Sequence, residues 1–223
     1  MTALHLTKAI IPYDIAARWD HGRGFADSYA WHQRVWEAFP GRESAERDFL
    51  TRLDDQSDGF RLLILSAQPP TRPAWCPEPS WHTKSISEAF LSHTRYEFSV
   101  VANPARKVRS NAEGKLLNNS RRVAIIHRDD REVDGRTQPG LLSWIIRKGT
   151  QHGFRLPHPE QVQTIPRPRR YFMKKNQPGL HAATEFQGVL EVTDPAAFQQ
   201  AFASGLGSAR AFGFGMLCLA PIS

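Results

Sequence analysis

The chain has 223 residues, of which 40% are hydrophobic and 23% are charged, with a formal net charge of +7. Its length fits one large domain or two small ones, and its hydrophobic share excludes an intrinsically disordered protein. No uncharged apolar run approaches the roughly 18 residues of a membrane span, and the N-terminal residues lack the order of a signal peptide. Two cysteines, Cys76 and Cys218, make a disulfide framework or a cysteine zinc site improbable. We therefore expect a cytoplasmic protein without a membrane segment.

The positive charge is concentrated in one part of the chain. Residues 104–175 contain 17 Lys and Arg against 6 Asp and Glu, whereas the remaining residues are acidic in sum. Such a concentration is what a polyanion-binding protein needs, because each neutralised phosphate releases counterions. A solvated basic face has the same composition, so the asymmetry favours nucleic-acid binding only slightly.

The first half predicts a strand over residues 4–11, a loop over 12–26 and a short helix over 27–39. Residues 45–53 fit a helix or a strand equally well. Apolar runs and alternation predict strands over 60–66 and 96–102, and the proline-rich stretch after residue 67 predicts a loop between them. The polar, basic residues 106–120 predict a linker, which places a domain boundary near residue 105.

The second half begins with a predicted strand over 122–126 and a helix after Gly140. Strands over 162–172 and 185–192 form a hairpin with a basic turn, and two prolines place the first of them at a sheet edge. Asp194 and Pro195 predict the start of a helix that ends at Gly205, and a strand over 212–219 follows. Each half thus approximates strand–helix–strand twice. We predict an α+β protein of two tandem ferredoxin-like domains, 1–105 and 121–223.

The helix over 27–39 contains the best catalytic candidate. His32, Val35, Trp36 and Phe39 share one face, and Tyr29 lies one turn before His32. An imidazole near a helix N-terminus, with a phenol beside it, can hold an anionic group and move protons. From these residues alone, a histidine that merely begins the core stripe is the favoured interpretation.

The predicted hairpin combines basic side chains with aromatic rings, and a glycine-rich segment covers residues 205–215. Arg210 stands where a dinucleotide-binding fingerprint needs its third glycine, so that fingerprint is absent. Arginine can grip phosphates or guanine edges. A structural turn and a solvated strand face are the competing interpretations. The candidate RNA-binding residues are Arg121, Arg122, Arg167, Arg169, Arg170, Lys174, Lys175 and Arg210.

The nine histidines have no metal-like spacing, and no G-x-S-x-G motif is present. We expect neither a metal nor a cofactor.

The chain resembles the CasE family, the repeat-RNA endoribonuclease subunit of type I-E CRISPR Cascade complexes. The resemblance runs nearly from end to end. The shared residues lie in Tyr29-x-x-His32-Gln-x-x-Trp36-x-x-Phe39-Pro40, Arg47-Asp48-Phe49-Leu50, Leu65-Ser66-Ala67-Gln68-x-Pro70, Ala102-Asn103-Pro104, Phe186-x-Gly188-Val189-Leu190 and the glycine-rich segment 205–215.

The resemblance implies two ferredoxin-like domains and metal-independent cleavage of precursor CRISPR RNA beside a repeat stem-loop. It also implies that the protein keeps the product and assembles with other Cascade subunits. His32 matches the catalytic histidine and Tyr29 fits the aromatic hydroxyl before it, while the arginines match only by region. The alternatives are a hairpin-RNA-binding scaffold subunit without activity and a general single-strand binder with ferredoxin-like domains.

Overall fold

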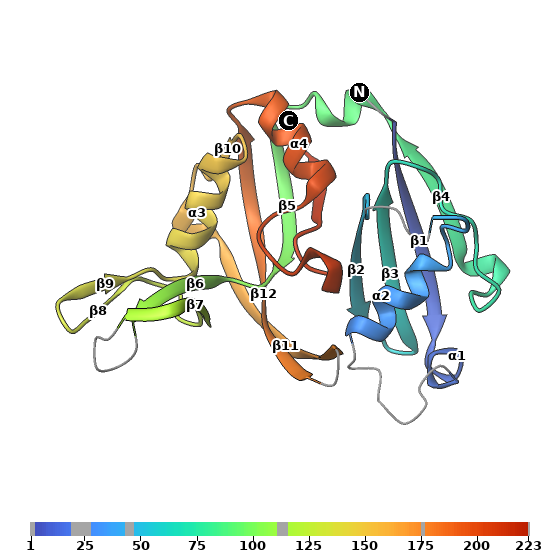
Figure 1. The fold of residues 1–223 in the computed structure, drawn as a ribbon. Helices are drawn as coiled ribbons and strands as arrows, with labels where there is room; N and C mark the ends of the chain where they lie inside the picture. The colour runs from blue at the N-terminus through green and yellow to red at the C-terminus, as the bar shows by residue number, and fades with distance from the viewer. Residues whose placement is uncertain (1–2, 19–27, 43–46, 111–115, 175–176, 223) are drawn as a thin grey trace.

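The computed structural model describes residues 3–18, 28–42, 47–110, 116–174 and 177–222. Two antiparallel sheets lie side by side, with α4 and α2 in front of them in the view of Figure 1. Two small hairpins extend from the second sheet's half. The chain is therefore an α+β protein with two sheet-based units.

The first sheet has the strand order β2-β3-β1-β4. This is the ferredoxin-like order, in which the first and third strands are central. Its elements are β1 (Leu4–Pro12), α1 (Tyr13–Ala17), α2 (Ser28–Trp36), β2 (Phe49–Asp55), β3 (Gly59–Ser66), the 3₁₀ turn η1 (Glu78–Ser80), β4 (Trp81–Ile86) and the 3₁₀ turn η2 (Glu88–Leu91).

Three details of this half differ from the sequence prediction. The ambiguous residues form strand β2, because Phe49 and Leu50 bury their side chains in the two cores. A short helix, α1, occupies part of the predicted loop over 12–26. The expected second helix is replaced by the turn η1 before β4, a strand that the sequence did not predict. The proline-rich stretch between residues 68 and 77 explains this replacement, since proline opposes a helix interior.

The second sheet has the order β10-β12-β5-β13, with β11 paired to the outer part of β12. This again is the ferredoxin-like order, and both predicted long helices are present. The elements are β5 (Arg95–Ala102), β6 (Ala105–Ser110), β7 (Leu116–Ala124), β8 (Arg131–Val133), β9 (Arg136–Gln138), α3 (Leu141–Gln151), β10 (Phe154–Arg155), the turn η3 (Pro159–Gln161), β11 (Gln163–Lys174), β12 (Gln177–Val192), α4 (Pro195–Ser204), the turn η4 (Arg210–Phe212) and β13 (Leu217–Pro221).

The boundary between the two sheets falls earlier than the predicted position near residue 105. Strand β5 pairs with β12 and β13, so the chain changes sheets between Ile86 and Arg95. The predicted linker over 106–120 contains most of the hairpin β6–β7, and the expected strand over 122–126 is the end of β7 rather than a strand of the sheet. Polar composition suggested a linker, but hairpin pairing satisfies the backbone groups of such a segment equally well.

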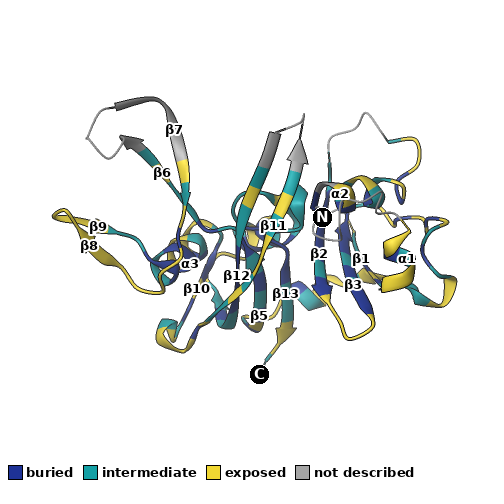
Figure 2. Ribbon diagram, turned by 90° about the horizontal axis from the view of Figure 1, so that it is seen from below, coloured by how far each residue is buried: buried dark blue, intermediate teal, exposed yellow. Residues whose placement is uncertain are grey.

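The two units share one continuous apolar boundary. Burial follows the inner faces of both sheets, whereas the hairpin β8–β9 is exposed (Figure 2). Leu50 and Leu65 of the first sheet are buried in the core of the second, together with Met216. The sheets are therefore fixed against each other by packing.

Candidate functional site

Helix α2 holds His32 at the edge of the first core. Trp31 and Val35 are buried against the first sheet, whereas His32 and Trp36 are half-buried. Phe39, the last member of the predicted stripe, is buried just beyond the helix. His32 is thus neither a sealed core residue nor a solvent-exposed one. Tyr29 belongs to the same helix, but its side chain lies outside the described residues, as does the whole of Asp27, the first residue of the predicted helix.

A hydrogen bond from Trp36 defines the state of the His32 ring. The indole Nε1 of Trp36 donates to His32 Nε2 over 3.1 Å. An indole N–H can only donate, so Nε2 accepts and the neutral ring has its proton on Nδ1. The ring also contacts Phe49 of β2, with the ring centroids 6.1 Å apart.

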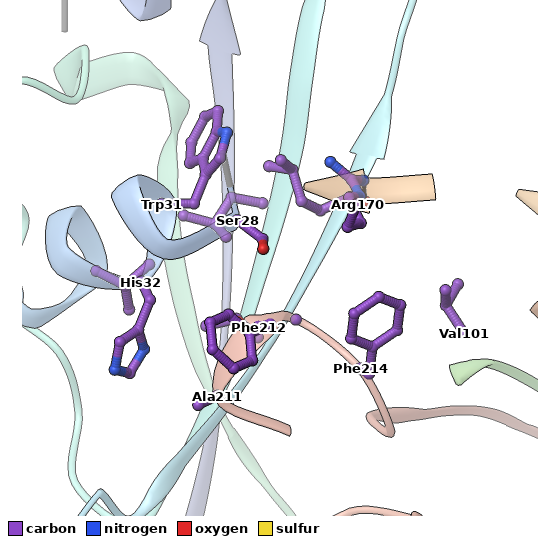
Figure 3. Close-up of a pocket in the computed structure, with 13 residues that line it drawn as sticks. Ser28, Trp31, His32, Val101, Arg170, Ala211, Phe212 and Phe214 are labelled. Atoms are coloured by element: carbon purple, nitrogen blue, oxygen red, sulfur yellow. Dashed lines mark hydrogen bonds between the residues drawn. The ribbon is translucent and has the colours of Figure 1, made fainter. Parts of the chain in front are cut away.

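Segments from both units enclose a pocket beside His32 (Figure 3). Helix α2 contributes Ser28 and His32, β2 contributes Thr51, β11 contributes Arg170, and the glycine-rich segment contributes Phe212. His32 and Arg170 lie on opposite sides of Ser28. The pocket therefore combines a titratable ring, a hydroxyl and a guanidinium.

Strand β11 is attached to the first unit at two points near this pocket. Ser28 Oγ donates to the carbonyl oxygen of Tyr171 over 3.3 Å, and Arg170 Nη2 donates to the carbonyl oxygen of Leu53 over 3.1 Å. Burial lowers the pKa of Arg170, and Asp55 and Asp54 act against that effect. These contacts place the hairpin β11–β12 next to the histidine helix.

The predicted RNA-binding residues have different environments. Arg169 and Arg122 are exposed. Arg167 Nε donates to Glu185 Oε2 over 2.7 Å, so its charge already has a carboxylate partner. The side chains of Arg121 and Lys174 lie outside the described residues, as does the whole of Lys175.

Arg210 does not line the histidine pocket. Its Nη1 donates to the carbonyl oxygen of Ser204 over 2.7 Å, and its side chain lines a separate groove together with Arg47. Arg47 was not among the residues predicted to bind RNA. The only sequence signal was its place in the Arg47-Asp48-Phe49-Leu50 motif.

The glycine-rich segment has a structural reason for its glycines. Gly205 ends α4 with φ +78°, and Gly215 has φ +86°. A Cβ on Gly215 would lie 2.2 Å from the carbonyl oxygen of Leu206. The segment therefore crosses close to its own backbone, which positions Phe212 beside α2.

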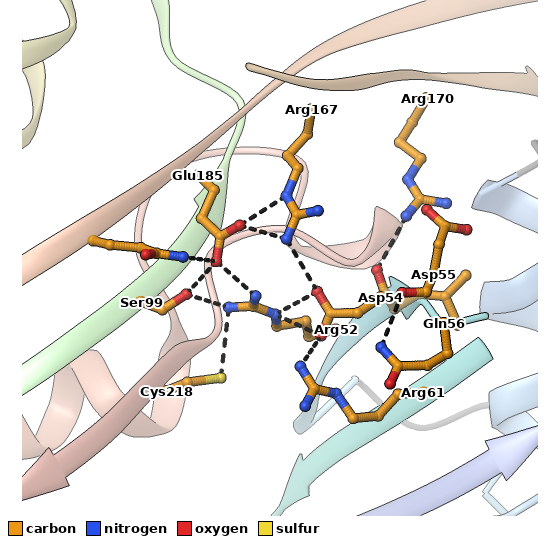
Figure 4. Close-up of polar contacts among 12 residues, drawn as sticks. Arg52, Asp54, Asp55, Gln56, Arg61, Ser99, Arg167, Arg170, Glu185 and Cys218 are labelled. Carbon is orange, nitrogen blue, oxygen red and sulfur yellow. Dashed lines mark hydrogen bonds and ion pairs between the residues drawn. The ribbon is translucent and has the colours of Figure 1, made fainter. Parts of the chain in front are cut away.

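A buried ionic cluster joins the two sheets (Figure 4). Arg52 of β2 donates to Asp54 over 3.0 Å, to Glu185 of β12 over 2.8 Å and to Ser99 of β5 over 2.6 Å. Burial alone would raise the pKa of Glu185, but hydrogen bonds from Ser99, Gln187 and Arg52 hold it at about 2. The carboxylate is therefore ionised at neutral pH.

Two further observations concern the described residues only. They contain no group of three or more His, Cys, Asp and Glu side chains arranged to bind a metal ion. No described helix is long and apolar enough to cross a membrane.

The fold and the site define a protein of two ferredoxin-like units with a histidine pocket formed jointly by both and a basic hairpin beside it. The sequence model of the family described as CRISPR associated protein matches residues 4–221. The chain belongs to this family.

Individual relatives agree with this assignment. The chain is 28% identical to the CRISPR system Cascade subunit CasE of Escherichia coli K12, covering 98% of this chain and 100% of the relative. It is 26% identical to the CRISPR-associated endoribonuclease Cse3 of Thermus thermophilus, covering 97% and 99%. The structure of Thermus thermophilus Cse3 bound to an RNA representing a pre-cleavage complex superposes with a TM-score of 0.71 at 25% identity, over 98% and 100% of the two chains. Cas6e from Escherichia coli K-12 superposes with a TM-score of 0.68 at 25% identity, with the same coverage.

Proposed function

We propose that the protein is a metal-independent endoribonuclease that binds the stem-loop of a CRISPR repeat, cleaves the precursor CRISPR RNA and remains bound to the mature product as a Cascade subunit in the cytoplasm. The carrying observation is the half-buried His32 in a pocket that α2, β11 and the glycine-rich segment build together. The names of full-length relatives, a Cascade subunit and an endoribonuclease, support the same function.

The proposed reaction needs two proton movements and stabilisation of charge on one phosphate. The ribose 2′-oxygen attacks the adjacent phosphorus, the bond to the 5′-oxygen breaks, and the products are a 2′,3′-cyclic phosphate and a 5′-hydroxyl. His32 takes the proton from the 2′-hydroxyl or supplies one to the leaving oxygen, a contribution of typically 10²–10⁴-fold. Arg170 is the described cation in the pocket and stabilises the developing negative charge. Tyr29 orients the RNA in this mechanism, because it lies one helical turn before His32 in the sequence.

The hydrogen bond from Trp36 sets a condition on this mechanism. The Nε2 lone pair is occupied in the structure, so proton transfer through Nε2 requires this bond to open when RNA binds. Trp36→Phe removes the competing donor and keeps most of the ring's packing. We expect its single-turnover cleavage rate to rise about 2–10-fold, the equivalent of a net hydrogen bond of about 0.5–1.5 kcal/mol. A fall in rate would mean that the indole orients the imidazole for catalysis.

The central test uses a labelled repeat stem-loop RNA with its flanking sequence, in EDTA. Wild-type protein should cleave it, and His32→Ala should lose about 10²–10⁴-fold in rate while still binding the RNA. A single 2′-deoxy sugar at the cut site should abolish cleavage. His82→Ala is the matched control, because His82 is an exposed histidine on β4.

Three results would contradict the proposal. A requirement for magnesium would exclude the metal-independent mechanism. Unchanged cleavage by His32→Ala would assign the chemistry to another residue. Tight binding of the stem-loop without any cleavage would identify an RNA-binding scaffold subunit instead.

A further inference from the structure

A second basic site lies outside the histidine pocket, in a groove between α4 and β2. Arg47 and Arg210 line this groove, together with Phe49 of β2 and with Gln199, Gln200 and Ser204 of α4. The groove also contains Asp48, but Arg42 pairs with that carboxylate over 3.0 Å. Its available side-chain groups are thus cations and amides.

Both guanidinium groups line the same groove and donate to backbone carbonyls. Arg47 Nη1 donates to the carbonyl oxygens of Phe49 and Arg210 over 2.9 and 2.8 Å. Arg210 Nη1 donates to the carbonyl oxygen of Ser204. Among the described residues, each guanidinium is oriented through one terminal nitrogen, and its other N–H donors can bind a ligand.

Neither arginine forms an ion pair with any carboxylate in the described part of the chain. Burial lowers the pKa of Arg47, and the nearby positive charge of Arg210 lowers it further. Two like charges at one site oppose each other, and an anion bound between them would remove this repulsion. Paired guanidiniums suit the oxygens of a phosphate in particular.

The groove lies close to His32, where an RNA strand that leaves the histidine pocket could enter it. The guanidinium carbon of Arg47 lies 5.8 Å from the Phe49 ring centroid, and the His32 ring contacts the same phenylalanine. In Figure 1, α4 lies on one side of η4 and the outer end of the hairpin β11–β12 lies on the other. A strand that passes His32 after leaving a stem held at the hairpin would continue toward α4.

We propose that Arg47 and Arg210 bind a phosphate of the single-stranded RNA that flanks the repeat stem-loop, and that the groove along α4 guides this strand away from the histidine pocket. This inference rests on the proposed function and extends it to a flanking-strand site. The amides of Gln199 and Gln200 lie along the same groove, where they can hydrogen-bond to the sugar or base edges.

The test compares two RNAs that carry a 2′-deoxy sugar at the cut site, so that binding is measured without cleavage. One is the stem-loop alone, and the other has single-stranded extensions on its 5′ or 3′ side. The proteins are wild type, Arg47→Gln, Arg210→Gln, the double variant and Arg210→Lys. Arg155→Gln is the matched control, because its exposed guanidinium lies on β10 and pairs with Glu191.

One extension should tighten binding by wild type about 10-fold, and the double variant should lose this gain while binding the bare stem-loop normally. The slope of log K against log salt for that extended RNA should fall by about 0.7 for the lost phosphate contact. Arg210→Lys should retain most of the gain, and Arg155→Gln should change neither RNA. Arg210→Gln alone should lose part of it, which keeps the test valid if Arg47→Gln impairs folding.

Two outcomes would overturn the inference. Equal weakening of both RNAs by the variants would assign Arg47 and Arg210 to the stem or to folding. The second outcome is that neither extension increases affinity, or that the increase is the same in wild type and in the arginine variants. The groove would then have no role in RNA binding. Failure of wild type to bind the bare stem-loop is a separate result, which would reject the proposed function itself.

Discussion

Two arginine sites in this molecule differ in what surrounds their guanidinium groups. In the ionic cluster between the sheets, Arg52 and Arg167 face the buried carboxylates of Asp54 and Glu185. In the groove beside α4, Arg47 and Arg210 donate to backbone carbonyl oxygens, and the positive charge of Arg210 acts on Arg47. Within the described residues, the arginines of the first arrangement all pair with carboxylates, whereas Arg47 and Arg210 pair with none and can bind an anionic ligand. An arginine-rich sequence therefore contains both structural and ligand-binding arginines. The partners of each guanidinium distinguish the two roles.

The largest effect on stability should come from a substitution in the buried ionic cluster between the sheets. Arg52→Met removes the guanidinium that Asp54, Glu185 and Ser99 share and leaves Glu185, which is 2% exposed, with one cation fewer. Removing one partner of a buried pair typically costs about 3–5 kcal/mol. We expect a loss of this size in urea unfolding at pH 7. Arg155→Met, at an exposed pair, should cost under about 1 kcal/mol. Equal effects of the two would contradict the comparison.

The same site should make stability depend on pH in the acid range. The pKa of Glu185 is held at about 2 in the folded protein, below its ordinary value of 4.5. A depressed pKa stabilises the folded state above the unfolded value, and this contribution is lost as pH falls from about 4.5 toward 2. The shift corresponds to a free energy of unfolding of the order of 3 kcal/mol. Thermal unfolding of wild type and Glu185→Gln across this range should show a flatter acid limb in the variant.

Arg170 provides an intermediate case, because its described partner is a carbonyl oxygen and it lines the histidine pocket. Arg170→Gln should lower the cleavage rate about 10–100-fold with little loss of RNA affinity, since it acts on charge that develops during the reaction. Arg169→Gln, at the exposed neighbouring residue, should instead weaken binding and reduce its salt dependence. An effect of Arg170→Gln on affinity alone would place this arginine in binding.

The smallest effect on stability should come from a substitution of Arg210 in the groove beside α4. Arg210 is exposed and its guanidinium donates to the carbonyl oxygen of Ser204, so Arg210→Gln should change the free energy of unfolding by at most about 0.5 kcal/mol. Urea unfolding measured beside Arg52→Met checks this directly. A large loss of stability would show that Arg210 is needed for the fold, and its role in the groove would then need another test.

The local elements were the most predictable part of the fold. Asp194 accepts a hydrogen bond from the backbone N–H of Ala197, Pro195 begins α4, and Gly205 ends it with positive φ, as the sequence indicated. Strand β11 lies at a sheet edge, as its prolines predicted. These features follow from interactions among residues that are close in the chain, so the sequence pattern contains them fully.

The fate of neighbouring arginines on β11 was not predictable in the same way. Alternation would place Arg167 and Arg169 on the same face of a regular strand. The pairing with β12 shifts between Arg167 and Arg170, and Arg167 faces Glu185 while Arg169 is exposed. An irregularity of this kind changes which face each following side chain takes. Predicting all the arginines as RNA-binding therefore missed the structural role of Arg167.

The sequence alone determined the α+β class, the helix that carries His32 and the concentration of positive charge, because periodicity and composition are local or additive properties, whereas the assignment of strands to the two units needed the structure. Only the tertiary structure decided that Trp36 occupies Nε2 of His32, that Arg170 lines the histidine pocket and that Arg210 joins Arg47 instead. The physical reason is that a charge or an imidazole takes its role from the partners around it. Partners brought together from β2, β11 and the glycine-rich segment are set by the packing of two sheets.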